Sequence, residues 1–136
     1  MRTRQSILLI EDDIVDQAMV REALKTIGSS VKLVVVSDGE EALEHLRAAP
    51  ERPGLILLDL NLPRMNGLEF LRELRQSEGL RCLPVVVLST SANEPDVEEC
   101  YRLCVAGYMV KPMGHEEFVA QMRAILDYWL RSVQPR

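Results

Sequence analysis

The sequence predicts an α/β fold in which a parallel sheet is covered by helices on both faces. Short apolar runs alternate along the chain with segments in which apolar residues recur at helical spacing. A run that is apolar throughout is typical of a strand buried on both faces, as the strands of parallel sheets are. Five strand–helix units of this kind predict a doubly wound, five-stranded parallel sheet with five helices.

The boundaries of these elements follow from the ends of the apolar runs and from capping residues. Asp13 is a predicted N-cap with Asp16 three residues later, Gly28 ends the same helix, and Asn93 caps the fourth helix. We expect strands at residues 6–10, 31–36, 55–58, 85–88 and 108–110, and helices at residues 13–27, 39–48, 68–76, 93–103 and 116–132. The apolar face expected for the first helix consists of Val15, Met19, Ala23 and Leu24.

Composition is that of an ordinary globular protein and argues against several functional classes. The 136 residues suffice for one domain, so we expect a single domain over residues 1–136 with no output domain. A net charge of −5 argues against nonspecific binding of nucleic acid. No apolar run approaches the ~18 residues of a membrane span, and no signal peptide precedes the first strand. The sequence therefore predicts a cytoplasmic protein.

Reactive side chains follow four of the predicted strands. Glu11 and Asp12 come after the first strand and Asp59 after the third. Ser89 follows the fourth strand, and Lys111 follows the fifth. The carboxyl ends of parallel strands meet at one edge of a sheet, which is where open α/β sheets bind ligands. We therefore expect these side chains to share one acidic pocket.

Carboxylates that lie this close repel one another unless a cation neutralises them. Mg²⁺ suits a cluster of hard oxygens with an open face, because it keeps several waters and also takes a phosphate oxygen. Lys111 adds a positive charge and Ser89 a hydroxyl donor around Asp59. The pocket therefore predicts that Asp59 is a nucleophile that accepts a phosphoryl group, with transfer assisted by positioning and charge stabilisation.

The same residues give the chain a resemblance to the receiver domain of bacterial two-component response regulators. They are Glu11-Asp12, Asp59 within Leu57-Leu58-Asp59-Leu60-Asn61-Leu62-Pro63, Ser89 after Val85-Val86-Val87-Leu88, and Lys111 within Tyr108-Met109-Val110-Lys111-Pro112. Asp59 is separated from Ser89 by 30 positions and from Lys111 by 52, as in that family. The resemblance extends from Ile7 to the last helix and implies a flavodoxin-like fold with strand order 2-1-3-4-5.

The resemblance implies that Mg²⁺ is the cofactor of the pocket. Its ligands would be the carboxylates of Asp12 and Asp59 and the backbone carbonyl of Asn61. Glu11 would act mostly through a water molecule. Asp13 is expected to cap the first helix instead of binding the metal.

The remaining implied roles concern the phosphoryl group and the response to it. Asp59 would be the phosphorylated residue, with Ser89 donating a hydrogen bond to the phosphoryl group and Lys111 pairing with its charge. Tyr108 would be an aromatic switch that works together with Ser89. A plain packing role for Tyr108 is the alternative.

A closer resemblance is to the small regulators that partner bacterial phytochromes. It rests on Val87-Leu88-Ser89-Thr90-Ser91, on Asn93-Glu94 with Asp96-Val97 in the next turn, and on the late aromatic pair Tyr128-Trp129. It implies that the partner is a sensor histidine kinase, of the phytochrome type, and that the signal leaves by protein contact without nucleic acid or membrane. Cys104 departs from the family pattern, because many receivers have Gly there, and this argues against a left-handed turn before the last strand.

Two functional classes fit the acidic pocket. The first is a stand-alone signalling receiver, a phosphoacceptor that is not an enzyme acting on other molecules. The second is a Mg²⁺-dependent phosphatase resembling the haloacid dehalogenases, but such enzymes need a general-acid Asp two positions after the nucleophile, where this chain has Asn61. His45 suggests a histidine phosphotransfer protein, yet those are helical bundles and this chain is rich in strands.

The final helix carries an apolar stripe wider than one sheet face needs. Its members are Phe118, Val119, Met122, Ile125, Leu126, Trp129, Leu130 and Val133. The last three, Trp129, Leu130 and Val133, are expected to lie beyond the sheet and to leave an apolar patch in water. The sequence therefore predicts a homodimer built on these residues. The alternative is that Trp129 folds back onto the first strand or helix.

Overall fold

The described part of the chain contains the strands and helices that the apolar pattern predicts. The structure is a computed structural model that describes residues 6–48 and 51–131. The strands are β1 (Ser6–Ile10), β2 (Lys32–Val36), β3 (Leu55–Leu58), β4 (Val85–Ser89) and β5 (Gly107–Val110). The helices are α1 (Ile14–Ile27), α2 (Gly39–Ala48), α3 (Gly67–Gln76), α4 (Glu94–Arg102) and α5 (His115–Arg131). Their ends differ from the predicted ones by one residue at most, because apolar runs and caps are local signals.

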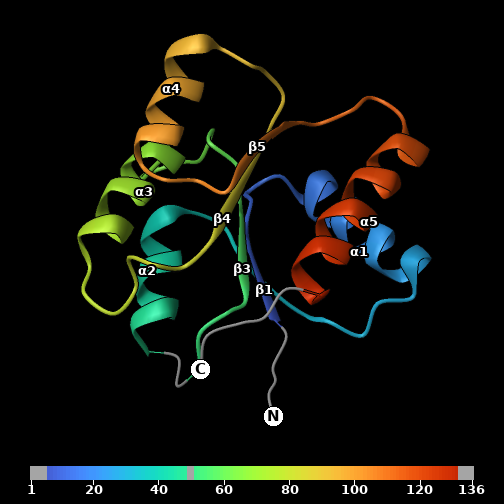
Figure 1. Cartoon of the computed structure of the whole chain (residues 1–136), viewed down its shortest axis with the longest axis horizontal. Helices are drawn as coiled ribbons and strands as arrows, with labels where there is room; N and C mark the ends of the chain where they lie inside the picture. Colours follow the sequence, from blue (N-terminus) through green and yellow to red (C-terminus); the bar gives the residue numbers. More distant parts are fainter. Residues whose placement is uncertain (1–5, 49–50, 132–136) are drawn as a thin grey trace.

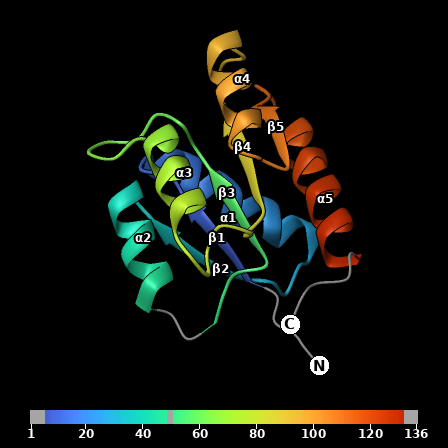
Figure 2. The ribbon, with the colours of Figure 1, turned by 60° about the vertical axis from the view of Figure 1, so that its left-hand side comes forward.

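The strands form one parallel sheet in the order β2-β1-β3-β4-β5. Leu8 of β1 is paired with Val34 of β2 on one side and with Ile56 of β3 on the other. Figure 1 shows α2, α3 and α4 on one face of the sheet and α1 and α5 on the other. The predicted flavodoxin-like, doubly wound fold is therefore confirmed. In Figure 2 the loop from β3 to α3 leaves the upper edge of the sheet, where the carboxyl ends of the strands lie.

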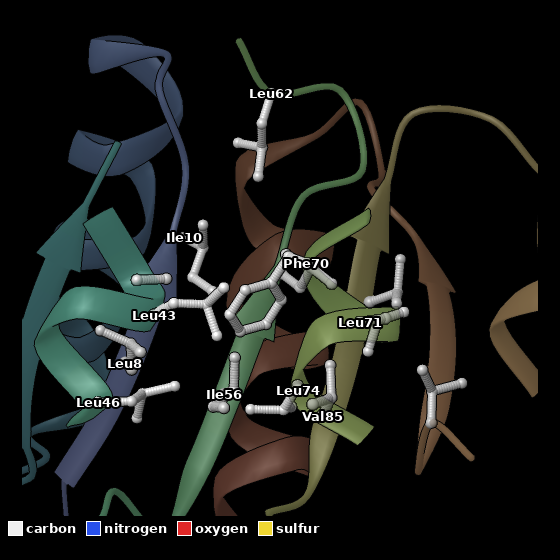
Figure 3. Packing of buried hydrophobic residues seen from close by; sticks show 14 of the residues in the cluster. Leu8, Ile10, Leu43, Leu46, Ile56, Leu62, Phe70, Leu71, Leu74 and Val85 are labelled. Atoms are coloured by element: carbon white, nitrogen blue, oxygen red, sulfur yellow. The ribbon is translucent and has the colours of Figure 1, made fainter. Parts of the chain in front are cut away.

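The central strands send alternate side chains into two separate cores. In β1, Leu8 and Ile10 pack against α2 and α3, whereas Ile7 and Leu9 pack against α1 and α5. Figure 3 shows the first core, in which Phe70 points from α3 toward the strands. Because helices cover both faces, these strands have no position that faces water, and they are apolar throughout for that reason.

Helices α1 and α4 begin where their capping residues predict. The Asp13 carboxylate accepts hydrogen bonds from amides in the first turn of α1, and Gly28 ends that helix with a left-handed φ of 79°. Asn93 caps α4, and Pro95 lies in its first turn, where a missing N–H costs nothing. No helix in the described ranges, 6–48 and 51–131, is long and apolar enough to cross a membrane.

The buried face of α1 differs from the predicted one. Val15 is 66% exposed, so its predicted place in the core is wrong. Val20 is buried in its stead, together with Ala23 and Leu24, and Met19 is partly buried against the same core. The helical period is as expected, but Val15 stands in the first turn, where the helix emerges from the loop at the edge of the sheet and has not yet reached the core.

Gly67 allows α3 to begin directly against the end of β3. A Cβ at this position would lie 2.6 Å from the Cα of Leu60 and 2.8 Å from the carbonyl oxygen of Asp59. The Gly67 amide also donates to the Leu60 carbonyl at 3.0 Å. A larger residue would push the helix away from the strand end, so this glycine helps to set the position of the segment that carries Asp59.

Arg75 of α3 ties together the segments that lead into β4 and β5. Its guanidinium group donates to the carbonyls of Leu103 at 2.7 Å, Arg81 and Leu83 at 2.8 Å, and Cys104 at 3.0 Å. Two of these hydrogen bonds, to Leu103 and Leu83, are partly buried. A single side chain therefore supplies the donors for two turns that lie far apart in the sequence.

We expect Arg75→Met to lower the free energy of unfolding by about 2–4 kcal/mol, because partly buried carbonyls would lose their donors. Urea denaturation followed by circular dichroism measures the loss. Arg72→Met is the matched control, since Arg72 lies on the same helix and, among the described residues, forms a 3.6 Å ion pair with Glu99 near the surface. It should cost less than about 1 kcal/mol. Equal losses in the two variants would show that the Arg75 hydrogen bonds contribute no more than a surface ion pair.

Candidate functional site

Three carboxylates converge at the carboxyl edge of the sheet. Glu11 follows β1 and Asp59 follows β3, and since these strands are neighbours their ends lie side by side. Oxygen atoms of Glu11, Asp12 and Asp59 all lie within 4.8 Å of one another. Glu11 and Asp59 are buried, whereas Asp12 is exposed. The predicted acidic pocket is therefore present, with one open side.

Burial makes two of these carboxyl groups harder to ionise. Desolvation raises the pKa of Glu11 to about 7, although its hydrogen bond with Lys111 opposes the rise. Burial is also the main cause that raises the pKa of Asp59, and the charge of Asp12 adds to it. The ionised pocket is therefore unfavourable by itself, and a cation that entered it would be stabilised.

Lys111 follows β5 and places its ammonium group in the same pocket. Its Nζ donates to Glu11 Oε1 and to Asp16 Oδ2, both at 3.0 Å. Burial by itself lowers the pKa of Lys111, but the hydrogen bonds to Asp16 and Glu11 outweigh it and raise the pKa. Lys111 is therefore positively charged at neutral pH, and the pocket contains the lysine that the sequence predicts.

Asp16 is a site residue that sequence reasoning missed. The sequence pattern assigns it to the capping of α1, whereas its carboxylate binds a lysine 95 positions away. The sequence feature that could have identified Asp16 as a site residue is its place in the first turn of a helix that begins at the acidic edge of the sheet. A pairing across that distance depends on the Lys111 side chain reaching the first turn of α1 along the edge of the sheet, which no local pattern reports.

Asn61 and Asp13 flank the carboxylates. The backbone N–H of Asn61 donates to Asp59 Oδ1 at 3.3 Å and so fixes one oxygen of that carboxylate. The Asp13 side chain accepts from the amides of Val15 at 2.8 Å and Asp16 at 3.2 Å. The predicted role of Asp13 as a helix cap is confirmed.

Ser89 and Tyr108 are connected through the loop that follows β4. Ser89 is buried at the end of β4, and its Oγ accepts from the Ser91 amide at 3.3 Å. The Tyr108 hydroxyl donates to the Ser91 carbonyl at 2.8 Å. The Tyr108 ring is partly buried against the core under α3 and α4, so packing and hydrogen bonding both act on it. Ser91, which the sequence marks only as part of the Val87-Leu88-Ser89-Thr90-Ser91 motif, connects the two predicted switch residues.

The loop between β3 and α3 is held to the start of α2. Arg64 has a left-handed φ of 58°, and its guanidinium forms an ion pair with Asp38. Asp38 is buried and also accepts from the Glu41 amide at 2.8 Å, which is the main cause that lowers its pKa. The Gly39 amide donates to the Met65 carbonyl at 3.1 Å. These bonds steady the loop that begins at Asp59.

The turn before β5 contradicts the expectation drawn from Cys104. Its φ is 63°, so the left-handed turn is present although the residue is not glycine. The Cys104 amide donates to the Tyr101 carbonyl at 3.0 Å, and its carbonyl accepts from Arg75 at 3.0 Å. These bonds offset a conformational cost of about 1–2 kcal/mol for a side chain in this region.

The last turns of α5 favour the alternative that Trp129 folds back. Trp129 is partly buried and packs against the core between the sheet, α1 and α5, with its ring edge-on to Tyr128 at 5.2 Å. Val119 and Leu126 are buried in that core as well. The side chain of Leu130 and the whole of Val133 lie outside the described residues. The homodimer therefore stays a prediction.

Comparison with known proteins shows relatives that match over nearly the whole length. The response regulator receiver domain matches residues 7–123. Response regulator Rcp1 of Synechocystis sp. is 41% identical over 132 residues, which cover 93% of this chain and 90% of Rcp1. A crystal structure of the Mn²⁺-bound form of Rcp1 has a TM-score of 0.86, with 97% of this chain and 99% of that chain covered.

Two further solved structures are similar. The phosphorylated cyanobacterial phytochrome response regulator RcpA has a TM-score of 0.91 at 38% identity, and the match covers 98% of this chain and 100% of RcpA. The response regulator RPA3017, in red light signalling of R. palustris, has a TM-score of 0.89 at 31% identity, with 97% and 99% covered.

These matches decide between the two classes that the pocket allows. They give no support to a phosphatase of the haloacid dehalogenase type, whereas the receiver domain accounts for the strand order and for the acidic edge. The relatives that match over nearly their full length include regulators associated with phytochromes. The chain belongs to the response regulator receiver domain family of two-component signalling.

Proposed function

We propose that Asp59 is the phosphoacceptor of this response regulator and that a sensor histidine kinase is its donor. The observation that carries the proposal is the place of the Asp59 carboxylate at the end of β3. It shares a pocket there with Glu11, Asp12 and Lys111. Family membership supports the same assignment, because a receiver domain receives its phosphoryl group on a carboxylate.

The proposed transfer is a displacement at phosphorus. An Asp59 oxygen attacks the phosphoryl group of a phosphohistidine, a P–O bond forms as the P–N bond breaks, and the released imidazole takes up a proton from water. Lys111 pairs with a phosphoryl oxygen, and Ser89 donates a hydrogen bond to another. No base is needed to generate the nucleophile, so positioning and charge stabilisation carry the reaction.

The pocket residues fit a divalent cation. Three carboxylates approach within 4.8 Å of one another, while Lys111 supplies one positive charge. Mg²⁺ would be held by Asp12, Asp59 and the Asn61 carbonyl, with Glu11 acting through water. When bound, it would neutralise the carboxylates and the charge on the transferred phosphoryl group. The Mn²⁺-bound form of the relative Rcp1 supports this assignment.

We further propose that Ser89 and Tyr108 transmit the phosphorylated state. Ser91 already links the two side chains, with its amide on Ser89 and its carbonyl on Tyr108. A shift of Ser89 toward a phosphoryl group would disturb this loop and release the Tyr108 hydroxyl. A protein partner would then bind the changed surface over α4 and β5.

The partner proposed on the donor side is a histidine kinase of the phytochrome type, in the cytoplasm. RcpA and RPA3017 support it, because the first is described as a phytochrome response regulator and the second as part of red light signalling. We also propose the homodimer that the sequence predicts, formed through the end of α5. It would suit a kinase that is itself two-fold symmetric.

Phosphotransfer from a purified, radiolabelled phytochrome-type kinase tests the proposed function. We expect rapid transfer from this kinase and slower transfer from an unrelated histidine kinase. Intact mass after incubation with acetyl phosphate should show one added phosphoryl group with Mg²⁺ and none with a chelator. No gain from any donor would contradict the phosphoacceptor role. Equal transfer from both kinases would contradict the phytochrome partner alone.

A further inference from the structure

The ammonium group of Lys111 has two anionic partners, and they come from different elements. Glu11 follows β1, whereas Asp16 stands in the first turn of α1. Both accept a hydrogen bond from Lys111 Nζ at 3.0 Å. The side chains of Lys111 and Glu11 are 13% and 3% exposed, whereas that of Asp16 is 31% exposed, so the bond to Glu11 is buried and the bond to Asp16 lies at the rim of the pocket.

Glu11 and Asp16 differ in what else they do. Glu11 belongs to the carboxylate cluster that fits a cation, together with Asp12 and Asp59. In the described part of the chain, Asp16 is not a member of that cluster. A cation in the cluster would draw Glu11 or its water toward itself and weaken the hydrogen bond that Lys111 donates to Glu11. Asp16 would then be the partner that still holds the lysine.

The geometry also leaves Lys111 free to act on Asp59. An ammonium group has three N–H donors, and Glu11 and Asp16 take two of them. Asp59 lines the same small cavity as these three side chains, and the rest of the lining is apolar. The third donor can therefore serve a phosphoryl oxygen on Asp59 without the lysine leaving its anchors.

We propose that Asp16 is a positioning residue that acts through Lys111, holding the ammonium group beside Asp59 when the metal engages Glu11. The proposal rests on the proposed phosphoacceptor role of Asp59. Under this proposal α1 contributes to the reaction as well as to packing. Its residue Asp16 binds Lys111 and is not one of the residues that would bind the metal. The negative charge of Asp16 in the first turn also stabilises the helix, because it interacts favourably with the positive end of the helix dipole.

The opposite view is that Asp16 acts only through its own negative charge. Removing a negative charge near the pocket would then favour the approach of an anionic phosphodonor and would speed phosphorylation. If Asp16 positions Lys111, its removal must slow phosphorylation, because the lysine loses its fixed direction. The two views therefore predict opposite signs.

Asp16→Asn is expected to slow phosphorylation by acetyl phosphate in saturating Mg²⁺ by roughly tenfold. Asp16→Glu, which restores the carboxylate, should recover most of the rate. Glu22→Gln is the matched control, because Glu22 is an exposed acid on the same helix and its loss should change nothing. Thermal melts with circular dichroism check that each variant is folded, and Asp16→Ser replaces Asp16→Asn if the latter is not.

A second measurement does not depend on phosphorylation. Nitrogen-15 relaxation of the Lys111 ammonium group should show greater mobility in Asp16→Asn with Mg²⁺ than in the wild type, and no change in Glu22→Gln. An unchanged or faster phosphorylation rate, or a slower rate with unchanged Lys111 mobility, would overturn the proposal. A wild-type chain that is never phosphorylated on Asp59 would instead refute the phosphoacceptor role, and the mobility measurement would still decide whether Asp16 anchors Lys111.

Discussion

Asp59→Asn is expected to abolish phosphorylation of the chain by acetyl phosphate and by its kinase. Asparagine keeps the size of the side chain and an oxygen for hydrogen bonding, but its amide is not a nucleophile toward phosphorus. Intact mass before and after hydroxylamine treatment measures the loss, because an acyl phosphate is labile to hydroxylamine. A hydroxylamine-labile phosphoryl group on the variant would show that another carboxylate is the acceptor.

Asp13→Asn is the control for this variant. Asp13 lies beside the carboxylate cluster, yet its side chain caps α1, and asparagine is an equally good N-cap. We expect Asp13→Asn to be phosphorylated at the wild-type rate. A loss as complete as that of Asp59→Asn would mean that general damage to the acidic edge, and not the missing nucleophile, explains the result.

Asp59→Asn should also change how the stability of the folded chain depends on pH. Burial raises the pKa of Asp59 in the folded chain, so between its unfolded value of 3.8 and the raised value the folded chain binds more protons than the unfolded chain. Ionised Asp59 therefore lowers stability at neutral pH. In chelator, Asp59→Asn should be more stable than the wild type at pH 7, by on the order of 1 kcal/mol. The difference should shrink as the pH falls toward 3.8.

Mg²⁺ is expected to raise the melting temperature of the wild type by a large amount. The cation relieves the repulsion among Glu11, Asp12 and Asp59, and a ligand that binds only the folded chain stabilises it by mass action. At a concentration of one hundred times the dissociation constant the gain is about 2.7 kcal/mol. For a domain of this size, that corresponds to roughly 10 °C. Thermal melts with increasing Mg²⁺ measure it.

Asp12→Ala should remove the Mg²⁺-dependent shift. Asp12 is the exposed member of the cluster, so the variant loses a ligand without opening a cavity in the core. Its metal-free melting temperature should not fall, since one source of repulsion is gone. Glu98→Ala, an exposed acid on α4, should keep the full shift. A wild-type melt unchanged at saturating Mg²⁺, with phosphorylation unaffected by chelator, would remove the metal from the proposed mechanism.

The sequence by itself determined the fold and most of the pocket, because the signals involved are local or topological. Strands buried on both faces must be apolar throughout, and this pattern predicts a doubly wound sheet. In such a sheet the ends of β1, β3 and β5 have to meet at one edge. The order of the strands and the residues that follow them are therefore enough to bring Glu11, Asp59 and Lys111 together.

Tertiary structure alone decided which partners these residues have. Asp16 looks like part of a helix cap in the sequence, and it becomes a partner of Lys111 only because the first turn of α1 and the residue after β5 lie at the same edge of the sheet, where the long lysine side chain reaches it. Val15 fits the apolar period of α1, yet its first turn lies where no core residue can cover it. Cys104 has the wrong side chain for a left-handed turn, and hydrogen bonds from distant segments hold the turn in place. For Asp16 and Cys104 a contact between remote segments overrides a preference of the local sequence, and for Val15 the packing leaves the side chain outside the core. Each outcome depends on how distant segments pack, and a local pattern does not contain that information.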